Sequence, residues 1–206
     1  MYFIKSPWWL KRYYNALTWN IPATDKTIYF TFDDGPHATI TPFVLDVLKE
    51  YNAKATFFCL GKNVRSNSNV YKRIIEEGHS VGNHSYNHLN GWNTDDSAYI
   101  KNIIVAREYI DSRLFRPPYG RITKFQIKQL KDVFNIIMWD VLSADFDIKI
   151  TPEQCLTNVI KNVSPGSIVV FHDSEKAFPR LKHALPKALD TLSKEGYTFK
   201  AIPQYL

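Results

Sequence analysis

Short apolar runs recur along the chain and are separated by segments with helical periodicity. The clearest run is 28–32, where Ile28, Phe30 and Phe32 alternate with a tyrosine and a threonine before two carboxylates and a Gly-Pro pair. This pattern predicts a buried strand that ends in a turn. Further strands are predicted at 55–60, 80–83, 135–139, 167–171 and 197–202.

Amphipathic helices are predicted between these strands. A Thr-Pro pair at 41–42 begins the first helix, and Thr151 and Gln154 form a capping box for a later one. The last helix contains Pro186, where a kink or a break is expected. Strands that alternate with helices predict an α/β fold with a parallel sheet, either open or closed into a barrel. The other helices are predicted at 70–77, 97–112 and 124–132.

The composition is typical of a single globular domain. With 206 residues, 45% of them hydrophobic and 22% charged, the chain can bury a sizeable core. It contains no stretch of about 20 apolar residues that could span a bilayer. The net charge of +6 is spread along the chain and accompanies no recognition motif, so no nucleic-acid partner is expected. Cys59 and Cys155 form no CxxC pair and are expected to be buried free thiols.

Residues 1–25 form a basic, aromatic arm ahead of the domain predicted over 26–206. Lys5, Lys11 and Arg12 interrupt the aromatic residues, so the arm has no unbroken apolar core of signal-peptide length. The sequence does not decide the localisation. We expect no signal peptide in the chain as written, which would leave it cytoplasmic, but a chain trimmed of a leader would look the same. The arm is expected to pack across the bottom of the barrel or in a neighbouring groove, with peripheral membrane contact as the alternative. Nothing in the sequence indicates the oligomeric state.

Two adjacent carboxylates end the first predicted strand. Asp33 and Asp34 lie at its carboxyl end, the edge where parallel α/β sheets and barrels bind ligands. Because successive residues of an extended chain point in different directions, one carboxylate could hold a metal while the other takes a proton. Asp-Asp-Gly-Pro is also an ordinary polar turn, so the tetrapeptide alone leaves both interpretations open.

His84 and His88 are four residues apart, which places both imidazoles on one side of a helical turn or a tight loop. This spacing is common among zinc ligands, although chance pairs of surface histidines are common too. The residue after His84 is Ser85, not the glutamate of the helical zinc-protease motif. A metal here would take its third ligand and its base from elsewhere, and Asp34 and Asp33 are candidates for these two tasks.

Further polar residues occur near the ends of predicted strands. Arg116 precedes two prolines and suits a rigid contact that keeps a carboxylate ionised. Asp145 with Phe146 follows the strand at 135–139, and His172 ends the strand at 167–171. Each of these residues also has a plain structural interpretation, as part of a surface ion pair or as a hydrogen-bonded core histidine. Only their combination indicates a catalytic site.

In combination, these segments resemble the polysaccharide deacetylases with a NodB-homology domain, carbohydrate esterase family four. The resemblance covers about residues 26–202 and keeps the family's motifs in order. It implies a distorted (β/α) barrel of about seven units, related to the TIM barrel. The motifs are Thr31 to Pro36, His84 to His88, Arg116 to Tyr119, Ser143 to Phe146 and Val170 to His172.

The resemblance implies a hydrolase that removes acetyl groups from N-acetylated or O-acetylated sugars of a polysaccharide with the help of a divalent metal. The metal ligands would be Asp34, His84 and His88, and Asp33 would be the general base. Zn²⁺ is the expected metal, and Co²⁺, Ni²⁺ or Fe²⁺ would also fit such ligands. Peptidoglycan, chitin oligomers, acetylated xylan, a capsule and lipid-linked sugars are all candidate substrates.

The same resemblance assigns roles to two charged pairs. His172 would be the general acid that protonates the departing amine, and Asp145 would keep its imidazole charged at neutral pH. Arg116 would have the opposite effect on Asp33, because a neighbouring positive charge favours the ionised carboxylate.

The resemblance also places residues around the acetyl group. Its oxyanion would lie near the backbone N–H of Tyr119, in a loop held by Pro118 and the proline before it. Phe146 and Val170 would form the pocket for the acetyl methyl, where the family usually has tryptophan and leucine. Leu142 stands where many members have another aspartate. These departures keep the pocket apolar but change its shape, so they bear on the substrate more than on the chemistry.

Two other functions fit the same residues. A metal-dependent amidohydrolase acting on a small non-sugar amide would use the same barrel and the same ligands. Aromatic loop residues that could bind sugars argue against this amidohydrolase. The remaining alternative is a non-catalytic carbohydrate-binding module, which would not need the base and the acid. The loop aromatic residues are Tyr86, Trp92, Tyr119 and Phe178.

Overall fold

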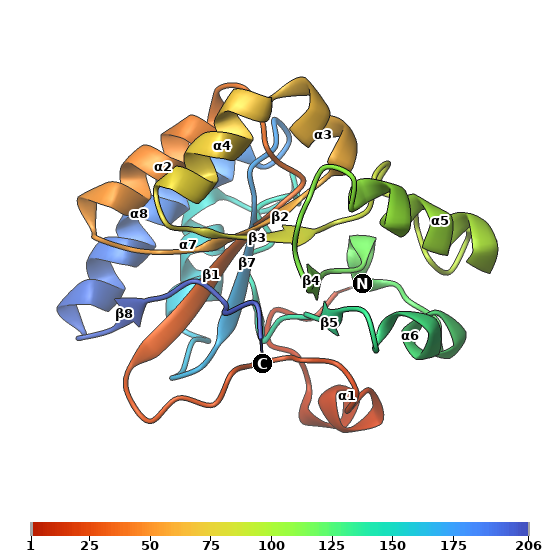
Figure 1. Ribbon diagram of the computed structural model, residues 1–206. Coiled ribbons are helices and arrows are strands. Elements are labelled where there is room, and N and C mark those ends of the chain that lie inside the picture. Colours follow the sequence, from red (N-terminus) through yellow and green to blue (C-terminus); the bar gives the residue numbers. More distant parts are fainter. Residues whose placement is uncertain (1, 206) are drawn as a thin grey trace.

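The computed structural model describes residues 2–205, which fold around one curled parallel sheet (Figure 1). The strands are β1 (Thr27–Asp33), β2 (Thr56–Cys59), β3 (Ser80–Asn83), β4 (Leu114–Phe115), β5 (Asn135–Ile136), β6 (Val141–Leu142), β7 (Ile168–His172) and β8 (Thr198–Phe199). They pair in the order β5-β4-β3-β2-β1-β7-β6, and β8 pairs with the start of β1. The first residue of the predicted arm and the last residue of the predicted domain lie outside the described residues.

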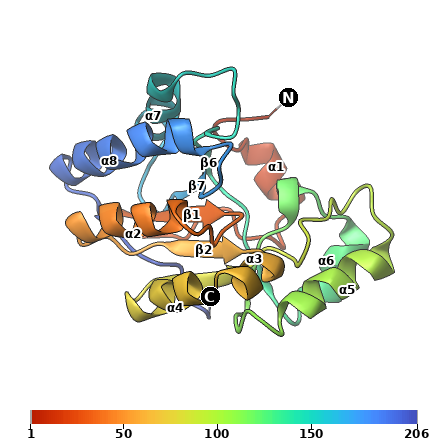
Figure 2. The same cartoon turned by 90° about the horizontal axis from the view of Figure 1, so that it is seen from above.

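The helices pack around the sheet in the same order as the strands. They are α1 (Trp8–Tyr13), α2 (Ile40–Glu50), α3 (Gly61–Ser66), α4 (Ser68–Glu76), α5 (Asp96–Ala106), α6 (Lys124–Leu130), α7 (Pro152–Ile160) and α8 (Phe178–Lys194), with a 3-10 turn at Pro118–Gly120. Contacts between neighbours run from α7 through α8, α2, α4, α3 and α5 to α6 (Figure 2). A curled parallel sheet inside such a ring is a distorted (β/α) barrel, so the predicted fold is confirmed.

Alternation along β1 sorts its side chains between the two sides of the sheet. Ile28, Phe30 and Phe32 are fully buried in the core that the sheet shares with α2 and α8. Tyr29 belongs to a separate cluster on the inner side of the barrel. Because side chains alternate along a strand, Asp33 points to the same inner side as Tyr29. The apolar pattern of the strand therefore also directs its terminal carboxylate.

Some helices differ from the sequence prediction. An additional short helix, α3, begins at Gly61, where the pattern predicts only the end of a strand. The helix α5 ends at Ala106 and not at 112, because the chain turns there and buries Ile110. The helix α8 runs without a break through Pro186. The proline removes one helical hydrogen bond, but the burial of leucines such as Leu185 in the core compensates for this loss.

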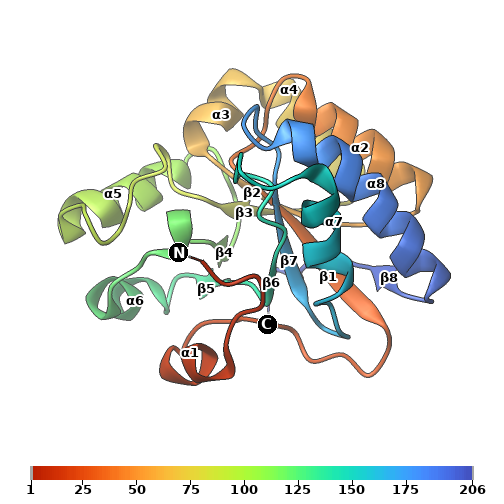
Figure 3. The same ribbon diagram turned by 180° about the vertical axis from the view of Figure 1, so that it is seen from behind.

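The N-terminal arm fills the gap between the two ends of the sheet, beside β5 and β6 (Figure 3). Lys5 pairs antiparallel with Val141 of β6, and Thr18 pairs with Ile137, next to β5. The strand predicted at 135–139 is therefore shorter in the structure, because the last residues of the predicted segment form hydrogen bonds with the arm. The arm lies in a groove beside the sheet and not across the bottom of the barrel. Among residues 2–205, no helix combines the length and apolar character that crossing a bilayer requires.

Candidate active site

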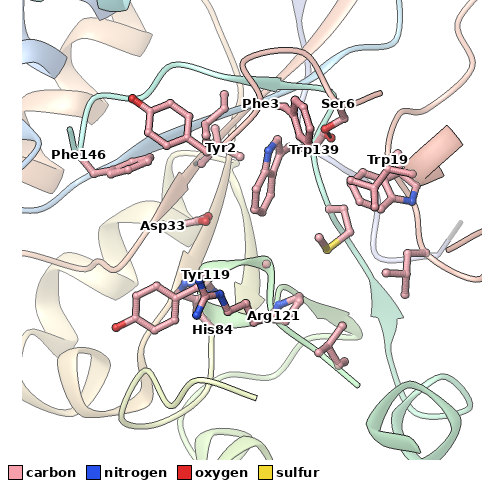
Figure 4. Close-up of a pocket in the computed structure, with 18 of the residues that line it drawn as sticks. Tyr2, Phe3, Ser6, Trp19, Asp33, His84, Tyr119, Arg121, Trp139 and Phe146 are labelled. Atoms are coloured by element: carbon pink, nitrogen blue, oxygen red, sulfur yellow. Dashed lines mark hydrogen bonds between the residues drawn. The ribbon is translucent and has the colours of Figure 1, made fainter. Parts of the chain in front are cut away.

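The carboxyl ends of the strands open into a cleft of about 1200 Å³ (Figure 4). Asp33 at the end of β1 and His172 at the end of β7 are register partners on neighbouring strands, so both reach this cleft. The predicted site residues that line the cleft are Asp33, Asp34, His84, His88, Tyr119, Phe146, Val170 and His172. The predicted residues that are buried behind this lining are Arg116, Pro118 and Asp145.

Three side chains in the cleft could hold a metal ion. Nε2 of His88 lies 3.3 Å and Nε2 of His84 lies 3.8 Å from Oδ1 of Asp34. Over the described part of the chain, this is the one group of three or more histidine, cysteine or acidic side chains whose donor atoms all lie within 4.8 Å of one another. Two imidazoles and a carboxylate are suitable ligands for Zn²⁺ and leave coordination positions for water and substrate.

Protonation and hydrogen bonding prepare these histidines to bind a cation. Burial lowers the pKa of His84, and burial together with the neighbouring His84 lowers the pKa of His88 to about 4. Both imidazoles are therefore neutral at pH 7, as metal ligands must be. Nδ1–H of His84 donates to the carbonyl oxygen of Arg116 at 2.8 Å, which leaves Nε2 to face Asp34. This donor set fits a divalent ion.

Left-handed backbone conformations shape the loops that carry these ligands. Asp34, Ser85 and His88 have φ angles of 82°, 67° and 62°, so the two histidines lie on a tight loop and not on a helical turn. The Ser85 hydroxyl accepts the backbone N–H of His88 at 3.0 Å, and the Ser85 N–H donates to Oδ1 of Asn83 at 2.7 Å. Residues other than glycine rarely adopt this conformation, and such strain is concentrated at functional sites.

Arg116 holds the Asp33 carboxylate from inside the barrel. Its guanidinium is fully buried, lies 4.1 Å from the centre of the Phe58 ring and donates to Oδ1 of Asp33 at 2.7 Å. It also donates to the Thr31 hydroxyl at 2.6 Å and to the Met138 carbonyl at 3.0 Å. Burial by itself raises the pKa of Asp33, but the positive charge and hydrogen bond of Arg116, together with the charges of His84 and His172, outweigh burial and hold this pKa below its ordinary value. The carboxylate is ionised at neutral pH.

Asp145 forms the second charged pair of the cleft with His172. Oδ1 of Asp145 lies 2.7 Å from Nδ1 of His172, and Oδ2 accepts the His172 backbone N–H at 2.7 Å. Arg180 donates to the Asp145 carbonyl oxygen and so fixes this loop. Burial by itself lowers the pKa of His172, but the charge and hydrogen bond of Asp145, together with the charges of Asp34 and Asp33, outweigh burial and raise this pKa to about 9. His172 therefore carries a proton at neutral pH, and its Nε2 remains for the cleft.

Aromatic rings flank both histidine groups. The exposed Tyr119 ring lies 4.5 Å from the His88 ring, centre to centre, and the Phe146 ring lies 5.3 Å from the His172 ring. Tyr119 has a φ of 59°, which turns its loop sharply after the prolines. Of the other loop aromatic residues, one lines the cleft, namely Trp92, and two pack on the core, namely Tyr86 and Phe178.

Asp173 is a supporting residue that sequence reasoning misses. It is buried, accepts the Gly35 backbone N–H at 3.0 Å and accepts the Thr41 hydroxyl. A Cβ atom on Gly35 would lie 2.1 Å from Oδ2 of Asp173, so this close approach requires glycine. The contact fixes the loop that follows the two aspartates. The only signal in the sequence is the position of Asp173 directly after His172.

The N-terminal arm contributes a second set of residues that sequence reasoning misses. Nothing in the local pattern of the arm indicates that it reaches the carboxyl ends of the strands. Its aromatic side chains nonetheless line the same cleft as the charged pairs, and they include Tyr2, Phe3, Trp9 and Tyr13.

The fold matches that of a carbohydrate esterase of family 4, PdaA of Bacillus subtilis, with a TM-score of 0.77 at 30% identity over 93% of this chain and 85% of that chain. The family profile described as polysaccharide deacetylase matches residues 20–133. The chain belongs to this polysaccharide deacetylase family.

Relatives of the chain include enzymes named for the bacterial cell wall. It is 36% identical over 197 residues to a peptidoglycan-N-acetylglucosamine deacetylase of Bacillus cereus, with 92% of each chain covered. It is 34% identical over 188 residues to the peptidoglycan-N-acetylmuramic acid deacetylase PdaA of Bacillus subtilis, which covers 86% of this chain and 70% of that protein. The crystal structure of the Bc1960 peptidoglycan N-acetylglucosamine deacetylase, in complex with 4-naphthalen-1-yl-N-oxidanyl-benzamide, matches with a TM-score of 0.87 at 33% identity and covers 96% and 95% of the two chains.

Proposed function

We propose that the protein removes N-acetyl groups from the amino sugars of peptidoglycan and that it uses a divalent ion, Zn²⁺ by default. One observation carries this proposal. A metal-binding donor set, an ionised carboxylate and a protonated histidine all converge on one cleft at the carboxyl edge of the barrel. The names of the relatives favour peptidoglycan among the acetylated polymers.

Asp34, His84 and His88 would hold the ion, because their donor atoms face one another and both imidazoles are neutral. When bound there, the ion would increase the acidity of a water molecule and polarise the acetyl carbonyl. Co²⁺, Ni²⁺ or Fe²⁺ would suit the same ligands, since geometry and availability decide which ion occupies a site. The remaining chemical tasks fall to the surrounding side chains.

Asp33 is the general base of the proposed reaction. Its carboxylate is ionised at neutral pH and lines the cleft, so it can take a proton from the attacking water. Arg116 keeps the carboxylate ionised and oriented from a fully buried position behind it. A positioned base typically contributes about 10²–10⁴-fold to the rate.

His172 is the general acid. The departing amine needs a proton, and the imidazolium can give one from Nε2 while Asp145 holds Nδ1. The backbone N–H of Tyr119 would donate to the developing oxyanion. Phe146 and Val170 line the cleft next to His172 and would enclose the acetyl methyl group.

The experiment is acetate release by metal-free protein, with and without added Zn²⁺ or Co²⁺. The substrates are peptidoglycan, N-acetylglucosamine oligomers and acetylated xylan, so that N-acetyl and O-acetyl groups are compared directly. The expected result is metal-dependent release with the highest kcat/KM on peptidoglycan. A clear preference for xylan would make the protein an O-deacetylase and overturn the proposed substrate.

The other two functions correspond to defined outcomes of the same experiment. No release from any of the three polymers by the metal-loaded protein would favour hydrolysis of a small non-sugar amide. Binding of sugar oligomers by metal-loaded protein without hydrolysis would instead favour a non-catalytic carbohydrate-binding module. Element analysis of the purified protein would identify the ion that it carries.

A further inference from the structure

The N-terminal arm is fixed to the barrel by polar contacts with the segment before β6. Lys5 and Lys11 both donate to the carboxylate of Asp140, which is 3% exposed. The Ser6 hydroxyl donates to the Trp139 carbonyl at 2.7 Å, and the Ser6 N–H donates to the Asp140 carbonyl at 2.8 Å. These contacts lie on both sides of the start of α1, so they fix this helix relative to the strand ends.

The fixed arm presents large aromatic side chains to the cleft. Four aromatic residues of the arm that line the cleft are each between 39% and 60% exposed, although aromatic residues are usually well buried. Exposed aromatic groups that gather at a cleft indicate a binding surface. We call this surface the aromatic face of the arm, and its residues are Tyr2, Phe3, Trp9 and Tyr13.

The side of the cleft that faces the arm carries the exposed ring of Tyr119. Figure 4 shows Tyr2 and Phe3 on one side, Tyr119 and Arg121 on the other, and Asp33 between them. The cleft of about 1200 Å³ is larger than the roughly 300–1,000 Å³ that is typical of a site for one small ligand. It therefore has room for more than the acetylated sugar alone.

We propose that the aromatic face of the arm is a distal subsite, which binds the sugar rings next to the acetylated sugar of a glycan strand. This inference rests on the proposed function. Sugar rings have flat faces of C–H groups that can pack on aromatic rings, whereas the hydroxyls at their edges need polar partners. Ser174 and Lys176 line the same cleft and offer such partners. The subsite is continuous with the acetyl-binding end of the cleft, so one strand can occupy both.

Trp9→Ala tests the subsite, and Trp8→Ala is its matched control. Both tryptophans lie on α1, but Trp9 lines the cleft whereas Trp8 is 76% exposed and does not. Trp9→Ala is expected to raise KM for an N-acetylglucosamine hexamer about three- to tenfold, because stacking on one ring is lost. KM for the dimer and kcat for both substrates should stay near the wild-type values.

Two further variants and substrates sharpen the comparison. Trp9→Phe retains an aromatic ring and should restore most of the affinity for the hexamer, whereas Trp8→Ala should change no parameter. A wild-type KM for the hexamer in Trp9→Ala would overturn the proposal. Equal increases of KM for the dimer and the hexamer would also overturn it, because they would place Trp9 at the acetylated sugar.

Calorimetric titration of the hexamer separates this proposal from the proposed function. Even if the wild type releases no acetate, weaker binding by Trp9→Ala supports the subsite, and unchanged or absent hexamer binding overturns it. Vesicles that contain anionic phospholipid test the membrane alternative. If Trp8→Ala and Trp9→Ala both reduce vesicle binding and leave hexamer binding unchanged, the arm binds lipid and the proposal is wrong.

Discussion

Asp33 and His172 face one cleft from neighbouring strands, yet their buried partners give them opposite protonation states at neutral pH. Arg116 keeps Asp33 ionised, and Asp145 keeps His172 protonated. A base and an acid can therefore coexist within one small volume, because each has its own charged neighbour. The two partners, Arg116 and Asp145, are both fully buried, so no substrate can contact them in place of their catalytic neighbours.

The variant Asp33→Asn tests the base directly. The amide is nearly the same size as the carboxylate but cannot take a proton, so kcat should fall by about 10²–10⁴-fold. Metal content should stay near that of the wild type, because Asp33 does not belong to the donor set of Asp34, His84 and His88. Acetate release and element analysis of the same preparation check both points. Loss of the metal in this variant would contradict the assignment.

The variant Asp145→Asn tests the acid through the pH dependence of kcat. The pKa of His172 is raised to about 9, so the wild-type protein keeps the proton at neutral pH and loses it as the pH rises through that value. A cation bound nearby would lower the pKa of His172 in both proteins, but this pKa would stay higher in the wild type than in Asp145→Asn. Without the carboxylate, burial lowers the pKa of His172, so the alkaline limb of the profile should move to lower pH. At pH 7.5 we expect a fall in kcat of about 10²-fold.

Glu153→Gln is the matched control for this profile. Glu153 also pairs with a histidine, His183, at 3.4 Å, but the pair lies on α7 and α8, and Glu153 is largely exposed. Its loss should leave the pH profile of kcat unchanged. If Asp145→Asn and the wild type have the same alkaline limb, His172 is not the group that Asp145 keeps charged, and another acid must be sought.

At the residue scale, the sequence indicates those groups whose type and spacing carry chemistry. The two aspartates and the two histidines are recognisable because few other roles require that combination at strand ends. Asp173 is not recognisable, because an aspartate that accepts a backbone N–H resembles any polar loop residue. Its function becomes visible only when the β7 end and the Gly35 loop are brought together.

At the scale of elements, the loop between β1 and α2 is where the site depends most on backbone geometry. Asp34 follows β1 in a left-handed conformation, and Gly35 packs against the side chain of Asp173. The Asn63 side chain donates to the Asp34 carbonyl at 2.7 Å and holds the loop from α3. Two neighbouring elements therefore fix the direction of one metal-binding carboxylate.

Gly35→Ala should disturb this loop and the site with it. The new Cβ atom would lie 2.1 Å from Oδ2 of Asp173, so one of the two must move. We expect a fall in the free energy of unfolding of about 1–3 kcal/mol and a fall in kcat/KM of about 100-fold. Urea denaturation and acetate release measure the two effects.

Gly196→Ala separates the clash from general glycine effects. Gly196 has a φ of 84°, but its nearest neighbour, Lys26, lies 4.0 Å from the added Cβ. It should lower the free energy of unfolding by about 1–2 kcal/mol and leave kcat/KM unchanged. Equal kcat/KM for Gly35→Ala and the wild type would show that the loop tolerates the displacement.

The elements themselves are predicted best where their pattern is local. The strand at 80–83 is found with both ends correct, because a helix stop and a change of polarity bound it. The strand β5 lies within the strand predicted at 135–139, but β4 and β6 are not predicted. These two strands have two residues each, and they pair with strands about 30 residues away in the sequence. No periodicity can develop over so short a segment, so the local sequence does not indicate them.

At the scale of the whole molecule, the arm completes the barrel that the sheet leaves open. Asp140 anchors it, because this one buried carboxylate accepts both Lys5 and Lys11 as well as the Ser167 hydroxyl at 2.6 Å. Burial by itself raises the pKa of Asp140, but these donors outweigh burial and hold the pKa below its ordinary value. The anchor is therefore ionised at every pH at which the protein is expected to work.

Asp140→Asn should loosen the arm. We expect the free energy of unfolding at pH 7 to fall by about 1–3 kcal/mol, because two charge-assisted hydrogen bonds are lost. The difference from the wild type should be complete above about pH 4 and disappear as the pH falls through the lowered pKa of Asp140. Urea denaturation over a pH series and proteolysis at Lys5 or Arg12 measure stability and arm release.

Asp190→Asn is the control for a surface pair. Its partner Lys194 is 74% exposed, so the loss of this pair should change the free energy of unfolding far less than Asp140→Asn does. An equally small effect of Asp140→Asn would contradict the anchoring role.

The arm is the part of the molecule that sequence reasoning places least well. Its basic and aromatic composition is typical of a segment that packs on another surface, and that surface could be a groove of the barrel or a membrane. The choice depends on Asp140, which lies 129 residues beyond Lys11 in the chain. In the isolated sequence it is one acidic residue among others, and only the folded barrel places it opposite both lysines.

The distance in sequence between the arm and its anchor also sets an order of events during synthesis. Lys5 and its partner Asp140 are 135 residues apart, and Tyr2 and its partner Asp147 are 145 residues apart. At a ribosomal rate of roughly 5–20 residues per second, the arm waits roughly 7–27 seconds for the anchor to be made. The aromatic residues of the arm thus leave the ribosome well before their partners are made, and until then they are free to associate with chaperones or with other nascent chains.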